Sequence, residues 1–188
     1  TEDTGGIDNG DITIISDKIV LQANASIGDD NEDITIRQFT NGVTIDLGAG
    51  VDDNNLGIDN VELSKIDADG GAGILTIGDA NSGAISISGN TDSLDDDTNT
   101  LHLISSSTVS GTGDIEVPNL AVTAGSTVDI DTLVDNLAVG LNALVAAEVT
   151  IEEQDDGDLN ITTVLSEIGI QDTTGNITVT MAASNSVL

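Results

Sequence analysis

Residues 10–14 read Gly10-Asp11-Ile12-Thr13-Ile14, and this pattern of a small or polar residue followed by apolar, polar and apolar residues recurs along the chain. An apolar residue at every second position has the period of a β-strand, and a leading Gly, Asp or Asn is a turn signal. The further copies are Glu32-Asp33-Ile34-Thr35-Ile36, Gly73-Ile74-Leu75-Thr76-Ile77, Gly113-Asp114-Ile115-Glu116-Val117, Gly157-Asp158-Leu159-Asn160-Ile161 and Gly175-Asn176-Ile177-Thr178-Val179. The repeated pattern predicts an all-β chain of short strands.

The spacing of these copies predicts a β-solenoid, in which each turn of the coil is a rung. The first inward apolar residues of the copies are Ile12, Ile34, Leu75, Ile115, Leu159 and Ile177. The middle three intervals between them are close to twice the outer two, so a rung of about 20–22 residues explains all five. The skipped rungs are expected near residues 56–63, 94–103 and 133–138, and the whole coil would hold about nine rungs.

Each rung is expected to contain more than one strand, because a second apolar pattern follows most copies, as 43–47 follows 34–36. One rung cannot bury its own apolar face, so it depends on its neighbours. We therefore predict a parallel β-helix in which residues 1–188 form a single domain. The domain would be a segment, or one tandem repeat, of a longer fibre, because joining Leu188 to a second Thr1 would place the next copy about one rung after Ile177.

One segment departs from the strand pattern, LVDNLAVGLNALVAAEV at Leu133–Val149. Leu133, Leu137, Leu141 and Leu144 are spaced like one face of a helix, whereas Gly140 weakens a helix. A short helix near 133–147 and irregular solenoid strands are both open at this point.

The core must be aliphatic, because the chain has no Trp, Tyr or Cys and only one Phe, Phe39. A β-sandwich of this size would normally fill the gap between its sheets with several aromatic side chains. Stacked Ile, Val and Leu side chains do not need them, so the composition favours a solenoid over a sandwich. The lack of cysteine also excludes disulfides, thiol catalysis and cysteine metal sites.

The formal net charge is −31, from 34 acidic residues against Lys18, Arg37 and Lys65. Such a surface repels nucleic acid and anionic membranes, and no apolar run approaches the roughly 20 residues of a membrane helix. We expect no nucleic-acid partner and no membrane insertion. The charge fits either an extracellular setting rich in salt or calcium, or an acidic coat that keeps the protein soluble.

Five stretches, taken together, resemble the β-strand repeats of large bacterial exoproteins of the filamentous-haemagglutinin kind, which are exported by two-partner secretion. They are ITIRQFTNGVTIDLGAG (34–50), NVELSKI (60–66), LTIGDANSGAISISG (75–89), GTGDIEVPNLAVTAG (111–125) and TTVLSEIGIQDTTGNITVT (162–180). The resemblance covers most of the chain and implies a right-handed β-helix that forms the shaft of a secreted or cell-surface adhesin. The family's Asn-Pro-Asn-Gly-type secretion motif has no counterpart here, where Pro118 is the only proline.

No catalytic site is expected. His102 is the only histidine, and its place in Leu101-His102-Leu103 predicts an outward, plain surface residue without a second histidine for a metal or a nucleophile beside it. A polysaccharide-active β-helix enzyme is the remote alternative, because carboxylates are plentiful. The Arg, Lys and aromatic side chains with which such enzymes hold sugars are almost absent.

Calcium is the one cofactor that the sequence suggests. Asp-rich corners occur at Asp29-Asp30, Asp52-Asp53, Asp67–Asp69, Asp95–Asp97 and Asp155-Asp156. Calcium takes six to eight oxygen ligands from flexible loops, which clustered carboxylates and carbonyls can supply. No complete calcium loop of a known type is present. Among the Asp-rich corners, the best candidate is the run Asp95, Asp96 and Asp97.

Threonine is frequent at outward strand positions, as at Thr13, Thr35 and Thr76. A regular threonine row can bind ice, but Glu116 and Asn160 interrupt this one, and threonine is also a good strand residue.

The leading hypothesis is a structural shaft or filament segment at the cell surface or in the extracellular space. The alternative is a calcium-dependent adhesive module. Neither 1–10 nor 182–188 resembles a polar cap, so both ends are expected to stack on neighbouring repeats or subunits. A host, surface or glycan receptor is the other expected partner.

Overall fold

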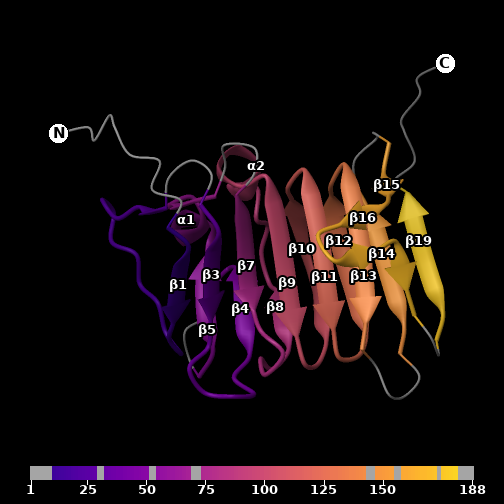
Figure 1. Cartoon of the computed structure of the whole chain (residues 1–188), viewed down its shortest axis with the longest axis horizontal. Helices are drawn as coiled ribbons and strands as arrows, with labels where there is room; N and C mark the ends of the chain where they lie inside the picture. The colour runs from indigo at the N-terminus through magenta and orange to yellow at the C-terminus, as the bar shows by residue number, and fades with distance from the viewer. Residues whose placement is uncertain are drawn as a thin grey trace.

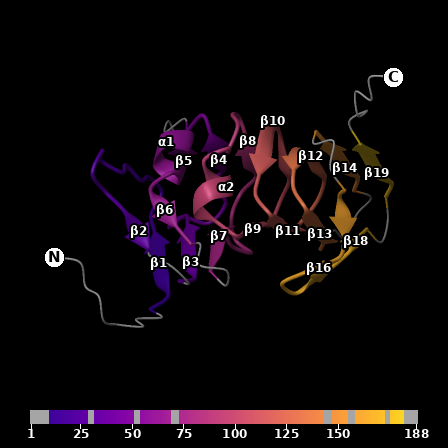
Figure 2. The same cartoon turned by 90° about the horizontal axis from the view of Figure 1, so that it is seen from above.

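A computed structural model of the chain describes residues 10–28, 32–50, 54–68, 73–142, 147–154, 158–172 and 175–181. Most of its regular structure is β-strand, and the strands lie parallel in two main sheets, within each of which they follow one another along the long axis of the molecule (Figure 1). The view from above shows the two sheets facing each other (Figure 2). The all-β prediction with parallel strands is confirmed, and the arrangement is consistent with a β-solenoid.

The first sheet contains the strands that carry most copies of the sequence pattern. Its order is β1 (Ile12–Ile15), β3 (Ile34–Arg37), β7 (Ile74–Gly78), β9 (Thr100–Ser105), β11 (Asn119–Ala124), β13 (Asn136–Leu141) and β15 (Asn160–Ile161), with β18 (Ile170–Gln171) also on β13. The second sheet runs β5 (Leu56–Asp59), β4 (Ile45–Gly48), β8 (Ile85–Ile87), β10 (Val109–Glu116), β12 (Val128–Leu133), β14 (Val149–Glu153) and β19 (Ile177–Met181). From β7 to β14 the chain alternates strictly between the two sheets.

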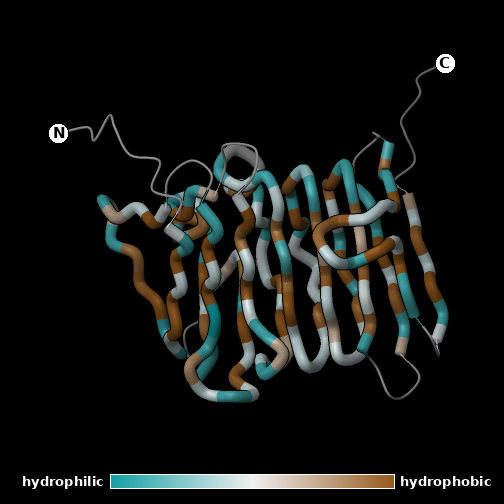
Figure 3. The backbone as a smooth tube through the Cα atoms, viewed as in Figure 1, coloured by the Kyte–Doolittle hydropathy of each residue, from teal (hydrophilic) through white to brown (hydrophobic). Residues whose placement is uncertain are grey.

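The core lies between the two sheets and is aliphatic, as predicted. One cluster of buried side chains runs from Ile19 to Ile151. In β3, for example, Ile34 and Ile36 are fully buried while Thr35 is only half-buried. Brown and pale segments alternate along the strands in Figure 3, which is the period-two pattern seen in the sequence. Because like residues stack in register, each buried side chain fills the space above and below its neighbours.

The length of a rung varies more than the sequence predicts. Ile12 pairs with Ile34, as the predicted period requires, but the step is shorter from Leu120 to its partner Leu137 and longer from Val149 to its partner Ile177. Ile34 pairs directly with Leu75, so this interval, nearly twice the predicted period, is a single step and not two rungs. The rungs expected near 94–103 and 133–138 are present as β9 and β13, whereas the one expected near 56–63 is not.

The residues near 56–63 turn back toward the start of the coil. After β4 the chain returns as β5, which pairs with β4 on the side away from β8. Helix α1 (Asn60–Leu63) follows, and β6 (Ile66–Asp67) then pairs with β2 (Ile27–Gly28). Asp59 caps α1, because its carboxylate accepts from the Glu62 N–H while the Glu62 side chain accepts from the Asp59 N–H. This excursion explains why the step from Ile34 to Leu75 is so long.

The alternative of a short helix near 133–147 is wrong for the residues of this range that the structure describes. Residues 143–146 lie outside the described part of the chain. Residues 136–141 form β13, which pairs with β11 over its whole length. Leu137 and Val139 point into the core above Leu120 and Val122, so stacking on the previous rung outweighs the helical spacing of the leucines. The short helices lie elsewhere, at α1 and at α2 (Leu94–Asp97).

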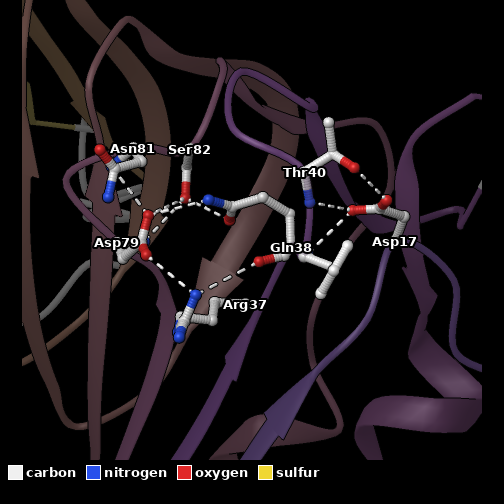
Figure 4. Close-up of polar contacts among 8 residues, drawn as sticks. Asp17, Arg37, Gln38, Thr40, Asp79, Asn81 and Ser82 are labelled. Carbon is white, nitrogen blue, oxygen red and sulfur yellow. Dashed lines mark hydrogen bonds and ion pairs between the residues drawn. The ribbon is translucent and has the colours of Figure 1, made fainter.

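Two polar corners tie successive rungs together (Figure 4). The Asp17 carboxylate accepts from the N–H groups of Phe39 and Thr40 and from the Thr40 hydroxyl, at 2.7–2.8 Å. These bonds, chiefly the one from the Thr40 N–H, lower the pKa of Asp17.

At the second corner, partial burial of Asp79 opposes its ionisation, but donors outweigh that cost and lower its pKa. The donors are the Gln38 amide at 2.8 Å, the Asn81 N–H at 2.8 Å and the Arg37 guanidinium at 3.3 Å. The Gln38 carbonyl in turn accepts from the buried Ser82 hydroxyl at 2.6 Å. Side chains from two successive strands of the first sheet are thereby fixed at one corner of the coil.

Candidate functional site

The outer face of the first sheet carries a small antiparallel hairpin. Strands β16 (Thr163–Val164) and β17 (Glu167–Ile168) pair with each other and project from the stack near its C-terminal end (Figure 2). Val164 is buried against Ala121 and Ala138, which are outward residues of β11 and β13. The Val139 N–H also donates to the Gly169 carbonyl at 2.8 Å. Small outward residues therefore make the flat seat on which the hairpin packs.

Gly140 completes this seat. A Cβ atom at Gly140 would lie 1.8 Å from Oε2 of Glu167, so any side chain there would displace the Glu167 carboxylate. With glycine in place, Oε1 of Glu167 accepts from the Thr123 hydroxyl at 2.7 Å. Besides the backbone bond from Val139 to Gly169, the hairpin is thus held by the apolar contact of Val164 and the charge-assisted hydrogen bond of Glu167.

His102 lies at the end of this polar contact. Its Nε2 is 3.0 Å from the Thr123 hydroxyl, whose proton points to Glu167. Nε2 is therefore assigned as the donor, and the neutral imidazole carries its proton there. Burial lowers the pKa of His102, and the negative charge of Glu167 offsets part of that effect. His102 does point outward, as predicted, but it is partly covered by the hairpin and is not a plain surface residue.

His102 does not act as a base toward Thr123 in this arrangement. A general base would accept the hydroxyl proton, whereas His102 donates to Thr123 and the hydroxyl proton goes to Glu167. These contacts indicate that His102, Thr123 and Glu167 hold the hairpin in place over the first sheet.

A shallow groove adjoins the hairpin on the same face. Along one outward column of the first sheet, Thr13 pairs with Thr35, Thr35 with Thr76, and Thr76 with His102. The column then continues to Ala121 and Ala138 beneath the hairpin. The groove is the uncovered part of the column, has a volume of about 430 Å³, and is lined further by Asp11, Asp33, Ile74, Leu165 and Ser166. Leu165 and Ser166, at the hairpin turn, form its end wall.

The outer face of the second sheet carries stacked carboxylates. Asp114, Asp131 and Glu152 occupy one column of β10, β12 and β14, and Asp129 lies two positions before Asp131 on the same face. Partial burial, followed by the charges of Glu152, Asp114 and Asp129, raises the pKa of Asp131. The column ends at β19, where Glu152 pairs with Thr180. We call these four residues the acidic column.

The calcium candidates are only partly visible. Asp95, Asp96 and Asp97 lie in α2 and not in an open corner, and the side chains of Asp95 and Asp96 are outside the described part. The Asp97 carbonyl accepts from the Ala68 N–H at 2.9 Å. Asp29, Asp30, Asp52, Asp53, Asp69, Asp155 and Asp156 lie outside the described residues. Within those residues no three His, Asp or Glu side chains gather in a metal-holding group. The calcium site stays a prediction.

The two ends of the stack differ. At the N-terminal end, residues 16–22 run along the outside of β1 and β5 (Figure 1), and together with α1 we call them the N-terminal cover. Ile19 belongs to the core, and the Leu21 N–H donates to Glu62 of α1 at 2.9 Å. The Lys65 ammonium donates to the Leu21 carbonyl at 2.8 Å. Leu63 of this cover is completely buried, and so are Leu56 and Ile58 beneath it.

At the C-terminal end, inward-facing positions are exposed. Ile85, Val109, Val128 and Val149 stack in register and are 0% exposed, but Ile177, next in the same column, is 47% exposed. In the first sheet Leu137 is fully buried and its partner Ile161 is 50% exposed. Among the described strands β19 pairs with β14 alone. We call β15 and β19 the C-terminal edge.

The hairpin, its seat and the N-terminal cover were not expected from the sequence. The available signals were small residues, Ala121, Ala138 and Gly140, at outward positions where other strands carry threonine or charge. They indicate that something packs on that face, but not which segment.

Comparison with known proteins identifies no relative: no family model, no curated protein and no solved structure matches this chain. The resemblance to filamentous-haemagglutinin repeats stays a prediction. None of the helices that the structure describes is long and apolar enough to cross a membrane.

Proposed function

We propose that this chain is a structural segment of a rod-like extracellular or cell-surface protein, a shaft of stacked β-rungs and not an enzyme. The observation that carries the proposal is the column from Ile85 to Ile177, in which burial is complete up to β14 and falls at β19, the last rung that the structure describes. Ile177 points inward as a stacking residue does, but it is half-exposed. A rod of stacked rungs has such a side chain at the position where another rung would pack on it.

The composition of the C-terminal edge supports this proposal. Residues 177–181 of β19 read ITVTM and carry no charge, whereas β10, β12 and β14 each carry acidic residues. Natural proteins usually place charge, proline or a bulge on an exposed edge strand to prevent pairing. An uncharged strand of β-branched residues suits pairing with another rung of the same kind, from a neighbouring repeat or subunit.

We further propose that the coil is closed, right-handed and exposed to the outside of the cell. The handedness follows from the resemblance and from the strong preference of parallel β-crossovers for the right hand. A charge of −31 keeps neighbouring rods apart along their sides and so restricts contact to the uncharged edge.

Electron microscopy with an antibody against this chain tests the proposal on cells that produce it. We expect labelled filaments or a surface layer outside the cell, and small-angle scattering of the purified chain should give an elongated particle. Labelling confined to the cell interior would contradict the proposed location. A compact particle in solution would contradict the rod.

Self-association tests the role of the C-terminal edge. The double variant Ile177→Lys, Met181→Lys adds charge to β19 and should abolish any concentration-dependent assembly in analytical ultracentrifugation. The matched control, Val20→Lys, Val61→Lys, changes two exposed residues at the N-terminal cover and should leave assembly unchanged. Equal effects of the two pairs would show that the C-terminal edge has no special role.

A further inference from the structure

The groove beside the hairpin has the composition of a ligand site. Its floor is the column Thr13, Thr35 and Thr76, and none of these hydroxyls makes a hydrogen bond within the described part of the chain. Neighbouring threonines on adjacent parallel strands are about 4.8 Å apart, so the floor presents evenly spaced hydroxyl groups. Each hydroxyl can both donate and accept a hydrogen bond.

The charge of the groove limits its occupant. Asp11 and Asp33 line it, and no lysine or arginine of the described chain does. Arg37 lies on the same strand as Thr35, but its guanidinium is turned to the Asp79 carboxylate at 3.3 Å. An anionic ligand, such as a phosphate, a sulfated glycan or nucleic acid, would meet only negative charge here.

Three of the four strands beneath the groove offer no place for an extended peptide to add. β3, β7 and β9 each pair with a neighbour on both sides, and among the described strands of the groove floor only β1, which carries Thr13, lacks a second neighbour. Over β3, β7 and β9 only side chains are available to a ligand. Hydroxyls and carboxylates on a flat face, with the apolar side chains of Ile74 and Leu165 beside them, match a ligand that carries hydroxyl groups along its edges and C–H groups on its faces.

We propose that this groove binds a linear oligosaccharide without acidic groups, with the threonine column and Asp33 contacting its hydroxyls. One oxygen of Asp33 accepts from the Ile74 N–H at 3.1 Å, which fixes the carboxylate and leaves its other oxygen for a sugar. Leu165 at the hairpin turn closes one end of the groove, and His102 lies where the floor meets that wall. The hairpin, held by Val164 and Glu167, is then the element that defines the length of the site. This inference does not depend on the shaft function.

Nuclear magnetic resonance titration of the full chain tests the proposal. The probes are uncharged β-linked oligomers of glucose and of N-acetylglucosamine, with a sulfated oligosaccharide and a lysine-rich peptide for comparison. We expect an uncharged oligomer to shift the signals of Thr35, Thr76 and His102 in a saturable way, and the sulfated one to leave them unchanged.

Variants then locate the site. Thr76→Val should weaken binding about three- to ten-fold, the effect of one hydrogen bond. Leu165→Gly should also weaken it while keeping the turn, because Leu165 has a φ of 55° that glycine adopts freely. The matched control Thr150→Val, an outward threonine of the second sheet, should bind as the parent does.

Three results would overturn the proposal. They are the absence of saturable shifts with every uncharged oligosaccharide, equal affinity of Thr76→Val and Thr150→Val, and binding of the lysine-rich peptide alone. The last would mean that the acidic surface attracts cations without a sugar site. None of these results bears on whether the chain is a rod.

Discussion

The two ends of the stack are built from the same kind of strand but reach opposite outcomes. At the N-terminal end the chain turns back, adds β5 and lays residues 16–22 across the opening, so that Ile58 is fully buried. At the C-terminal end Ile177 and Met181 have the same alternation but remain 47% and 44% exposed. The strand pattern therefore determines which way a side chain points, and the neighbouring rung determines whether it is buried.

Truncating one inward isoleucine at each end gives the largest expected difference. Ile58→Ala should reduce the free energy of unfolding by about 2–5 kcal/mol, because it leaves a cavity under the N-terminal cover. Ile177→Ala should cost less than about 1 kcal/mol, because the side chain is half in water already. Urea unfolding followed by circular dichroism measures both, and similar losses would mean that the C-terminal edge is covered in solution.

A side chain at Gly140 tests the hairpin, which braces β13 next to the exposed end. Gly140→Ala should displace the Glu167 carboxylate, break its hydrogen bond with Thr123 and reduce the free energy of unfolding by about 1–3 kcal/mol. Amide exchange of residues 162–171 should accelerate. Thr123→Val removes the same bond without the steric clash and should have the smaller effect. If the amides of residues 162–171 exchange as slowly in both variants as in the parent, the hydrogen bond between Thr123 and Glu167 does not hold the hairpin.

A smaller change in stability is expected from a substitution in the acidic column. This column is densely charged, whereas β19 carries no charge. Because the pKa of Asp131 is raised, ionisation costs the folded state free energy, and that cost disappears as the pH falls through the folded pKa toward the ordinary value of 3.8. Asp131→Asn should therefore stabilise the chain at pH 7 by about 0.2–1 kcal/mol, the range of a cross-strand pair. The gain should vanish below about pH 4.

Thermal melts at pH 7 and at pH 3.5 measure this difference. The exposed corner residue Asp135 provides a control, since Asp135→Asn removes one charge outside the column. Equal stabilisation by both variants would indicate that only net charge matters.

The smallest expected effect is the titration of His102. Its pKa is lowered in the folded state, so the unfolded chain takes up the proton first as the pH falls below 6.5. The free energy of unfolding should therefore decline between pH 7 and pH 5.5 in the parent and less so in His102→Gln. Urea titrations at the two pH values give the difference between the proteins, and parallel declines would show that His102 is open to solvent.

Much of the stack could be predicted from local alternation. Ile34 and Ile36, or Leu75 and Ile77, are inward because their neighbours are polar, and stacking then follows from the recurrence of the pattern. The helical spacing of Leu137 and Leu141 suggested a wrong alternative, because local spacing carries no information about strand β11, which lies beside them.

The candidate site was much less predictable, for the same physical reason. Nothing in Leu101-His102-Leu103 indicates that Glu167, far along the chain, will lie over its face. The back-turn of β5 was also missed, since alternation identifies a strand but not its partner. Contacts between distant segments depend on loop paths that neither the period of the strands nor the composition encodes.

The direction of the backbone hydrogen bonds has a mechanical consequence. In this stack the ladders between strands run along the long axis, so a pull from end to end loads the bonds of one interface after another, in series. Such a rod would yield by peeling off one rung at a time, beginning at the weakest interface. The corners at Asp17 and Asp79 reach across rungs, so they add side-chain cross-links to the backbone ladders near the N-terminal end.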